Sequence, residues 1–125
     1  MLHVEDPLPS KIMYLYHATY RPYVRQIFEQ GLGGARKSIP RNYEDSKSGV
    51  VYLASSPEVA LSYAETSDAV PAEWLDEIVV LRVHVEHLDA TFLQADRNVK
   101  LAEGEQPETF EYHAVILPAA LELIG

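Results

Sequence analysis

The sequence predicts an α+β fold, and three features of the chain support this prediction. Several short segments are rich in β-branched and aromatic residues, only one or two segments show helical spacing, and the two kinds do not alternate regularly. Regular alternation would instead indicate a parallel sheet wrapped by helices. One or two short helices among five or more strands, in 125 residues, indicate a single domain spanning residues 1–125.

The first strand and the first helix are expected before residue 33. Residues 11–17 (KIMYLYH) are rich in β-formers, which predicts a strand ending near His17. The segment RPYVRQIFEQGL that follows places Ile27 and other apolar residues on one helical face, and Gly31 is suited to end the helix. Residues 32–49 show no periodicity, which predicts a long exposed loop.

The middle of the chain predicts a strand, a helix and a second strand. Residues 50–54 (VVYLA) form a short apolar run typical of a buried strand. Ser56 is a candidate N-cap, with Pro57 at the first position of a helix that would reach about Glu65. Residues 77–87 (EIVVLRVHVEH) give the longest strand signal, and their apolar majority favours a central place in the sheet.

The last third of the chain predicts two further strands or more. Residues 88–108 are mixed and indicate one short strand between loops. The segment TFEYHAVI then predicts a strand from Thr109 to about Ile116, a break at Pro118 and a final apolar segment.

Composition excludes several classes of protein. Hydrophobic residues make up 47% of the chain and charged residues 23%, as in ordinary globular proteins. The absence of cysteine excludes disulfides, thiolate metal sites and a cysteine nucleophile. No apolar run approaches the roughly 18 residues of a membrane span, and the acidic start is unlike a signal peptide. Cytoplasmic residence without a membrane partner is therefore expected.

The charge balance bears on binding partners. The formal net charge is -9, which opposes nonspecific attachment to nucleic acid. Half of the positive charge falls within residues 21–41, either as a basic patch or as an ordinary solvated face. His84, His87 and His113 are candidate metal ligands, but residues three apart on a strand point to opposite faces, so no metal site is expected.

Neither a Gly-x-Ser-x-Gly elbow nor a P-loop is present, and what remains is a spaced set of four polar residues. They are His17 in the first strand, Tyr52 in the next, Tyr63 on the following helix and Glu111 in a late strand. Each has an ordinary explanation when taken alone: a strand-end residue, core tyrosines and a solvated acid.

Taken in order, the segments that carry these residues resemble the ADP-ribosyltransferase family. The resemblance is to its His-Tyr-Glu branch, which includes diphtheria-toxin-like enzymes and poly(ADP-ribose) polymerases. It rests on YHAT (16–19), VYLASSPEVALSYA (51–64), IVVLRVHV (78–85) and FEYHAVILPAALELI (110–124). It implies a split β-sheet core with short flanking helices, and NAD used as a substrate without a metal.

The resemblance also implies a role for each residue of the first motif and of the loop after the first helix. His17 matches the histidine that hydrogen-bonds the adenosine ribose of NAD. Ala18 matches a position whose backbone holds the nicotinamide carboxamide, and Thr19 matches a small hydroxyl residue. The loop at 32–49 stands where the family has a lid, so Arg36 and Arg41 are expected to meet the pyrophosphate.

In the same resemblance, Tyr52 and Tyr63 are the two aromatic walls around nicotinamide, and Glu111 is the catalytic glutamate. Ala60 departs from the polymerases, which carry a serine three residues before the second tyrosine. Glu108 and Glu105 compete with Glu111 for the catalytic role. Strand alternation favours Glu111, because Thr109, Glu111 and His113 would share a face that excludes Glu108.

The expected activity is mono-ADP-ribosyl transfer from NAD to a protein or nucleic-acid target. Arginine-directed members carry a glutamate where Thr109 stands, so arginine modification is disfavoured. Two alternatives stay open: an RNA 2′-phosphotransferase of the same fold, and a catalytically silent module that binds NAD, ADP-ribose or a protein. The small size suggests a toxin-like role with a neutralising protein partner.

Overall fold

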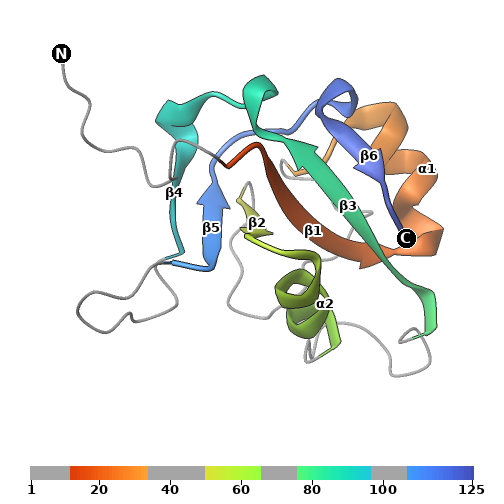
Figure 1. The fold of residues 1–125 in the computed structure, drawn as a ribbon. Coiled ribbons are helices and arrows are strands. Elements are labelled where there is room, and N and C mark those ends of the chain that lie inside the picture. Colours follow the sequence, from red (N-terminus) through yellow and green to blue (C-terminus); the bar gives the residue numbers. More distant parts are fainter. Residues whose placement is uncertain (1–11, 34–49, 66–75, 97–106) are drawn as a thin grey trace, which may run out of the picture.

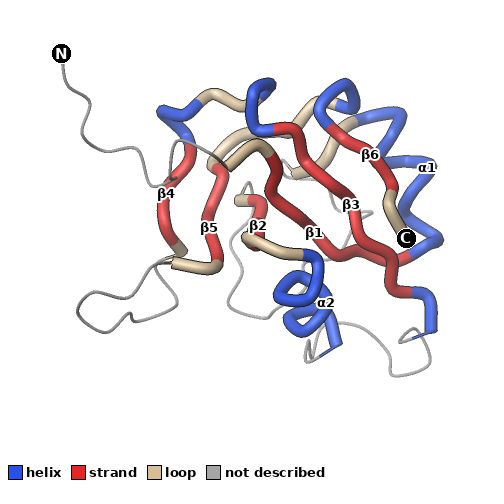
Figure 2. Tube along the Cα trace, viewed as in Figure 1, coloured by secondary structure: helices blue, strands red, loops and turns tan. Residues whose placement is uncertain are grey.

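The structure, a computed structural model, describes residues 12–33, 50–65, 76–96 and 107–125. These residues form a six-stranded antiparallel sheet and two α-helices (Figures 1 and 2). The strands are β1 (Tyr14–Tyr20), β2 (Val51–Ala54), β3 (Ile78–His84), β4 (Leu93–Ala95), β5 (Thr109–Tyr112) and β6 (Leu121–Leu123), and the helices are α1 (Arg21–Gln30) and α2 (Pro57–Glu65). The predicted α+β class is therefore confirmed.

The two helices pack on opposite faces of the sheet. Alternate strand residues pack against Ile27 of α1, and we call this side the α1 face; its strand members include Leu15, Leu53, Leu81, Val83 and Phe110. The residues between them pack against Ala60 and Ala64 of α2, and this side is the α2 face; its strand members include Ala18, Ala54 and Val80. Neither helix of the described residues is long and apolar enough to cross a membrane.

The strand order is β4-β5-β2-β1-β3-β6, and the sheet has a weak seam between β2 and β1. β1 pairs with β3 over seven residues, from Tyr14 to Tyr20, and β2 pairs with β5 along its entire length. By contrast, β1 and β2 are registered at one residue pair, Tyr16 with Ala54. The sheet is thus two three-stranded halves that are joined narrowly.

The first strand lies three residues later in the chain than its sequence predicts. It runs to Tyr20, so His17 lies in the middle of β1 and not at its end. The prediction was wrong because Ala18 and Thr19 are paired with Val80 and Val79 of β3, and such pairing overrides the weak local preference of alanine. The end of α1 is as predicted: Gly31 has φ 90°, and its N–H donates to the Ile27 carbonyl at 2.7 Å.

The start of α2 is also as predicted. The helix begins at Pro57, and the Ser56 hydroxyl oxygen accepts a hydrogen bond from the Val59 N–H at 3.2 Å. The Ser56 carbonyl accepts the next one, from Ala60 N–H at 3.1 Å. The cap fixes the direction in which α2 leaves β2.

Replacing Ser56 with alanine is expected to lower the free energy of unfolding by about 1 kcal/mol, because the Val59 N–H then loses its side-chain acceptor. Chemical denaturation measures this loss. Ser55→Ala is the matched control, because Ser55 donates a hydrogen bond to the Glu108 carbonyl through its backbone N–H, which the substitution retains. Equal losses of unfolding free energy in Ser56→Ala and Ser55→Ala would contradict the role of Ser56 as the N-cap of α2.

Two strands are shorter than predicted. β3 ends at His84 and the chain continues as a 3₁₀ turn over Val85–His87. β5 ends at Tyr112, and Ile116 instead forms an isolated bridge to Leu32. In both places the apolar pattern continues past the last residue that has a partner strand, so hydrophobicity alone overestimates the strand.

Candidate functional site

Tyr52 and Glu111 are direct cross-strand partners at the centre of one half-sheet. The register of β2 and β5 pairs Tyr52 with Glu111, and it pairs the flanking Leu53 with Phe110. Because Phe110 belongs to the α1 face, Glu111 and Tyr52 project from the α2 face. Side chains of such partners are neighbours, so the predicted tyrosine and glutamate are brought together.

His17 is joined to the same place from the other half-sheet. Its Nδ1–H donates to the Tyr52 carbonyl at 2.8 Å, next to the seam where β1 and β2 are registered only at Tyr16 and Ala54. The pairing of His17 with Leu81 means that its side chain leaves β1 on the α1 face and reaches sideways to β2. A carbonyl partner requires the proton on Nδ1, which makes Nε2 an acceptor in the neutral ring.

Removal of the His17 ring from water lowers its pKa, and the hydrogen bond to the Tyr52 carbonyl opposes that effect only in part. The imidazole is therefore neutral at pH 7. A neutral ring with a fixed tautomer is suited to hydrogen-bonding a hydroxyl group.

This lowered pKa predicts a pH-dependent stability. The unfolded chain takes up a proton at His17 near pH 6.5, before the folded protein does. The contribution of His17 is therefore flat above that value, and stability falls as pH drops from about 6.5 toward the folded-state pKa. His17→Asn keeps a donor for the Tyr52 carbonyl but cannot titrate. Chemical denaturation between pH 8 and 5 should show that the free energy of unfolding falls less steeply with pH in the variant than in the native protein. Parallel pH profiles of the two proteins would contradict the lowered pKa of His17.

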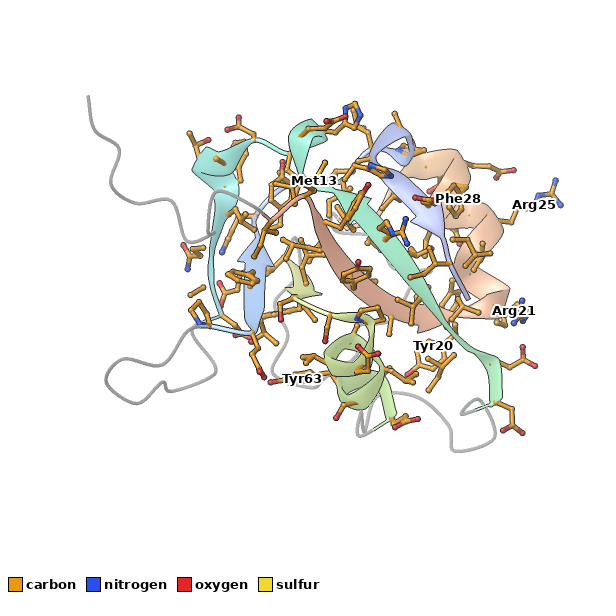
Figure 3. All side chains as sticks on the ribbon, viewed as in Figure 1. Met13, Tyr20, Arg21, Arg25, Phe28 and Tyr63 are labelled. Carbon is orange, nitrogen blue, oxygen red and sulfur yellow. The ribbon has the colours of Figure 1, made fainter. Side chains whose placement is uncertain are left out.

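Tyr63 and Ala18 lie on the side of α2, whereas Thr19 lies on the opposite face of the sheet. Tyr63 is half-buried on α2, and Figure 3 shows it projecting from that helix toward the side of β5. Ala60, one turn earlier, is buried against the sheet, where a serine hydroxyl would be withdrawn from water. Ala18 is buried in the same cluster, whereas Thr19 is buried and alternates to the α1 face with His17.

Glu111 is a buried acid, with 2% of the residue exposed. Its Oε1 accepts hydrogen bonds from His113 Nε2 at 2.9 Å and from Gln94 Nε2 at 3.3 Å. A carboxylate is withdrawn from water at a high cost unless donors replace the solvent. Of the two competing acids, Glu108 is exposed and precedes β5, and Glu105 lies outside the described residues.

Sequence reasoning missed the roles of Gln94 and His113. The spacing of two residues between Glu111 and His113 does indicate that they share a face, as strand alternation predicts. No local signal points to Gln94, because its contact depends on the register that pairs β4 with β5.

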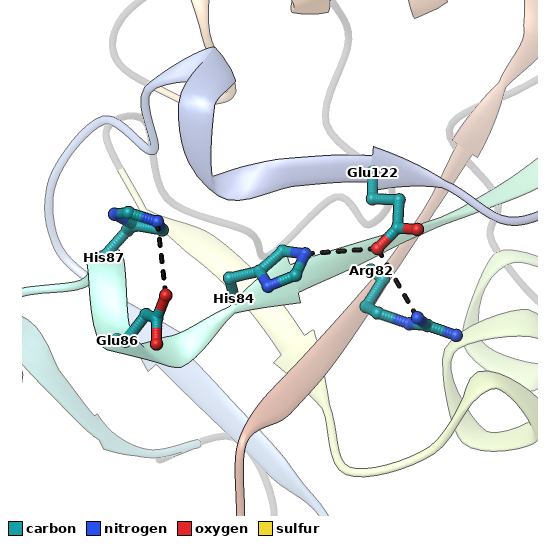
Figure 4. Close-up of polar contacts among 5 residues, drawn as sticks. All are labelled: Arg82, His84, Glu86, His87 and Glu122. Atoms are coloured by element: carbon teal, nitrogen blue, oxygen red, sulfur yellow. Dashed lines mark hydrogen bonds and ion pairs between the residues drawn. The ribbon is translucent and has the colours of Figure 1, made fainter.

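His84 and His87 were predicted to point to opposite faces of one strand, and this prediction was wrong. The strand ends at His84, and the 3₁₀ turn brings the two rings to a centroid distance of 6.4 Å (Figure 4). Each ring lies next to a different acid: His84 Nε2 is hydrogen-bonded to Glu122 Oε1 at 3.1 Å, and His87 Nε2 lies 3.6 Å from Glu86 Oε2. Among the described residues no group of three or more such side chains is arranged to hold a metal.

Arg36 and Arg41, expected at the pyrophosphate, lie outside the described residues. In the described residues Tyr52 and Glu111 are cross-strand partners on the α2 face, and His17 reaches the backbone carbonyl of Tyr52 from the α1 face. Tyr63 lies on α2, the helix that packs on the α2 face. The chain matches no known family model and no curated protein sequence.

Proposed function

We propose that this protein is an NAD-dependent mono-ADP-ribosyltransferase with a fold of that family. It cleaves the bond between nicotinamide and ribose and transfers ADP-ribose to a protein or nucleic acid. The observation that carries the proposal is the pairing of Tyr52 with Glu111 on one side and the hydrogen bond of His17 to Tyr52 on the other. The three residues lie far apart in the sequence, and Tyr52 contacts the other two: His17 through its backbone carbonyl, and Glu111 as its cross-strand partner.

The architecture supports the same proposal. The resemblance implies a split sheet, and the two half-sheets here share one registered pair between β1 and β2. The three residues come from strands on both sides of this seam. A dinucleotide that binds along the seam would meet residues of both β1 and β2.

The chemistry explains why these residue types are needed. Departure of nicotinamide builds positive charge on the ribose, so a fixed carboxylate beside the 2′-hydroxyl stabilises the transition state more than the ground state. Glu111 has that role in the proposal. The nicotinamide ring is flat and electron-poor, so the faces of Tyr52 and Tyr63 bind it and hold the scissile bond in a reactive pose.

The proposed step is balanced without a further reactant. The bond between C1′ of the ribose and the nicotinamide nitrogen breaks, and its electron pair leaves with neutral nicotinamide. A nucleophile of the target attacks C1′ and releases one proton to solvent. Water in place of the target gives hydrolysis of NAD to ADP-ribose and nicotinamide.

RNA 2′-phosphotransfer needs basic side chains for an RNA phosphate, and three of the ten basic residues of the chain lie in its described part. The described part of the chain contains three arginines and no lysine. Each of these arginines is paired with a glutamate: Arg21 with Glu77, Arg25 with Glu29 and Arg82 with Glu122. Their charge is therefore offset locally.

Removing either tyrosine ring is expected to weaken NAD binding about threefold to tenfold, which is the worth of an aromatic stacking contact. The substitutions are Tyr52→Ala and Tyr63→Ala. Calorimetric titration measures the dissociation constant, and a Glu111→Gln background keeps NAD intact during the experiment.

Two controls make this prediction specific. The Tyr→Phe variants retain the ring and should bind NAD within about twofold of the parent. Tyr23→Ala removes a partly buried tyrosine that packs against the core of the α1 face, so NAD affinity should not change. Unchanged NAD affinity in both Tyr52→Ala and Tyr63→Ala would contradict the proposal that these two rings bind nicotinamide between them.

A further inference from the structure

Two side-chain donors converge on one oxygen of the Glu111 carboxylate. His113 Nε2 lies 2.9 Å from Oε1, and Gln94 Nε2 lies 3.3 Å from the same atom. The donors approach from two sides, because Gln94 is the partner of Glu111 on β4 and His113 follows Glu111 by two residues. A carboxylate that accepts two hydrogen bonds at one oxygen has little freedom to rotate.

The two ends of the His113–Glu111 contact differ in their access to water. The side chain of Glu111 is 2% exposed and that of His113 is 32% exposed. The histidine is therefore the outer member of the pair, and its ring lies between the buried acid and solvent. Such an arrangement orients the carboxylate, because both donors act on the same oxygen.

We propose that His113 is a positioning residue for Glu111, and this inference rests on the proposed function. His113 would not contact the reacting atoms. It would hold the Glu111 carboxylate at the angle at which the acid meets the ribose 2′-hydroxyl, and Gln94 would steady the same oxygen from β4. Transition-state stabilisation by a fixed charge is sensitive to small displacements, so the loss of such a support lowers the rate more than the binding.

The test compares three substitutions at His113 by nicotinamide release from NAD. His113→Leu removes the donor, and the rate constant for release should fall about tenfold to a hundredfold, as when an outer hydrogen-bonding partner of a metal ligand is lost. The NAD dissociation constant should change less than about threefold. His113→Gln carries an amide nitrogen near the place of Nε2 and should recover most of the rate. His113→Asn has a shorter side chain that does not reach this place, and it should stay low.

Each alternative gives a different result. A His113→Leu variant as fast as the native protein, or faster, would overturn the inference and identify the ring as a passive or obstructing cover. Equal losses in the Leu and Gln variants, with matching falls in Tm, would overturn it in favour of a purely structural role. If the native protein releases no nicotinamide, the proposed function itself fails and no positioning role is left. If the native protein and His113→Leu both release nicotinamide at the native rate, the positioning role of His113 is rejected and the proposed function stands.

Discussion

Replacing Glu111 with glutamine should lower the rate of nicotinamide release from NAD about a hundredfold to a thousandfold. This is the loss expected when one preorganised electrostatic partner of a transition state is removed. The amide retains an oxygen that can accept from His113 and Gln94, so the fold and the NAD dissociation constant should be nearly unchanged. Release is followed by chromatography or NMR at saturating NAD.

The matched control for this substitution is Glu108→Gln. Glu108 is exposed and lies just before β5, and it is the acid that competes with Glu111 in the sequence. Its replacement should leave the rate within about twofold of the native value, since surface changes away from a site are usually mild. Full activity of Glu111→Gln together with an inactive Glu108→Gln would reverse the assignment.

The largest expected effect on stability comes from Phe110, the residue directly before Glu111. Its side chain is fully buried in the core on the α1 face, with 1% exposed. Phe110→Ala should lower the free energy of unfolding by about 3–5 kcal/mol, because burial is lost and a cavity remains. Urea denaturation with a two-state fit measures the change.

Phe92→Ala is the control for this prediction. Phe92 is 44% exposed and touches Tyr112 edge-on, so its loss should cost less than about 1 kcal/mol. Similar losses at Phe92 and Phe110 would contradict the arrangement of β5 in which alternate residues face the core. That arrangement is also what sets Glu111 on the α2 face.

Local signals in the sequence were sufficient to predict the fold class and the helix ends. Ser56 caps α2 through the Val59 N–H, and Gly31 ends α1 with a positive φ that other residues rarely adopt. These features depend on residues within one or two turns of each other. A short-range pattern therefore contains the necessary information.

The ends of the strands could not be predicted in the same way, because they depend on partners far along the chain. β1 continues past His17 since β3 pairs with it as far as Tyr20 and Ile78. β5 stops at Tyr112, although its apolar pattern extends to Ile116, which pairs with Leu32 instead. Nothing in either segment alone specifies where its partner ends.

The candidate site was predictable to the same limited degree. Alternation placed Glu111 and His113 on one face, and their side chains are in fact bonded at 2.9 Å. The contact from Gln94 depends on the pairing of β4 with β5, which the mixed segment before β5 does not reveal. The role of Tyr52 as the meeting point of His17 and Glu111 likewise required the sheet order.

The most direct test of the proposed function is a proton NMR time course of NAD mixed with the native protein. The experiment is run alone and with candidate protein and nucleic-acid targets, so that hydrolysis and transfer are both observed. The proposed function predicts that signals of free nicotinamide appear with the native protein and are nearly absent with Glu111→Gln. An NAD spectrum that stays unchanged with the native protein, with every target present, would contradict it.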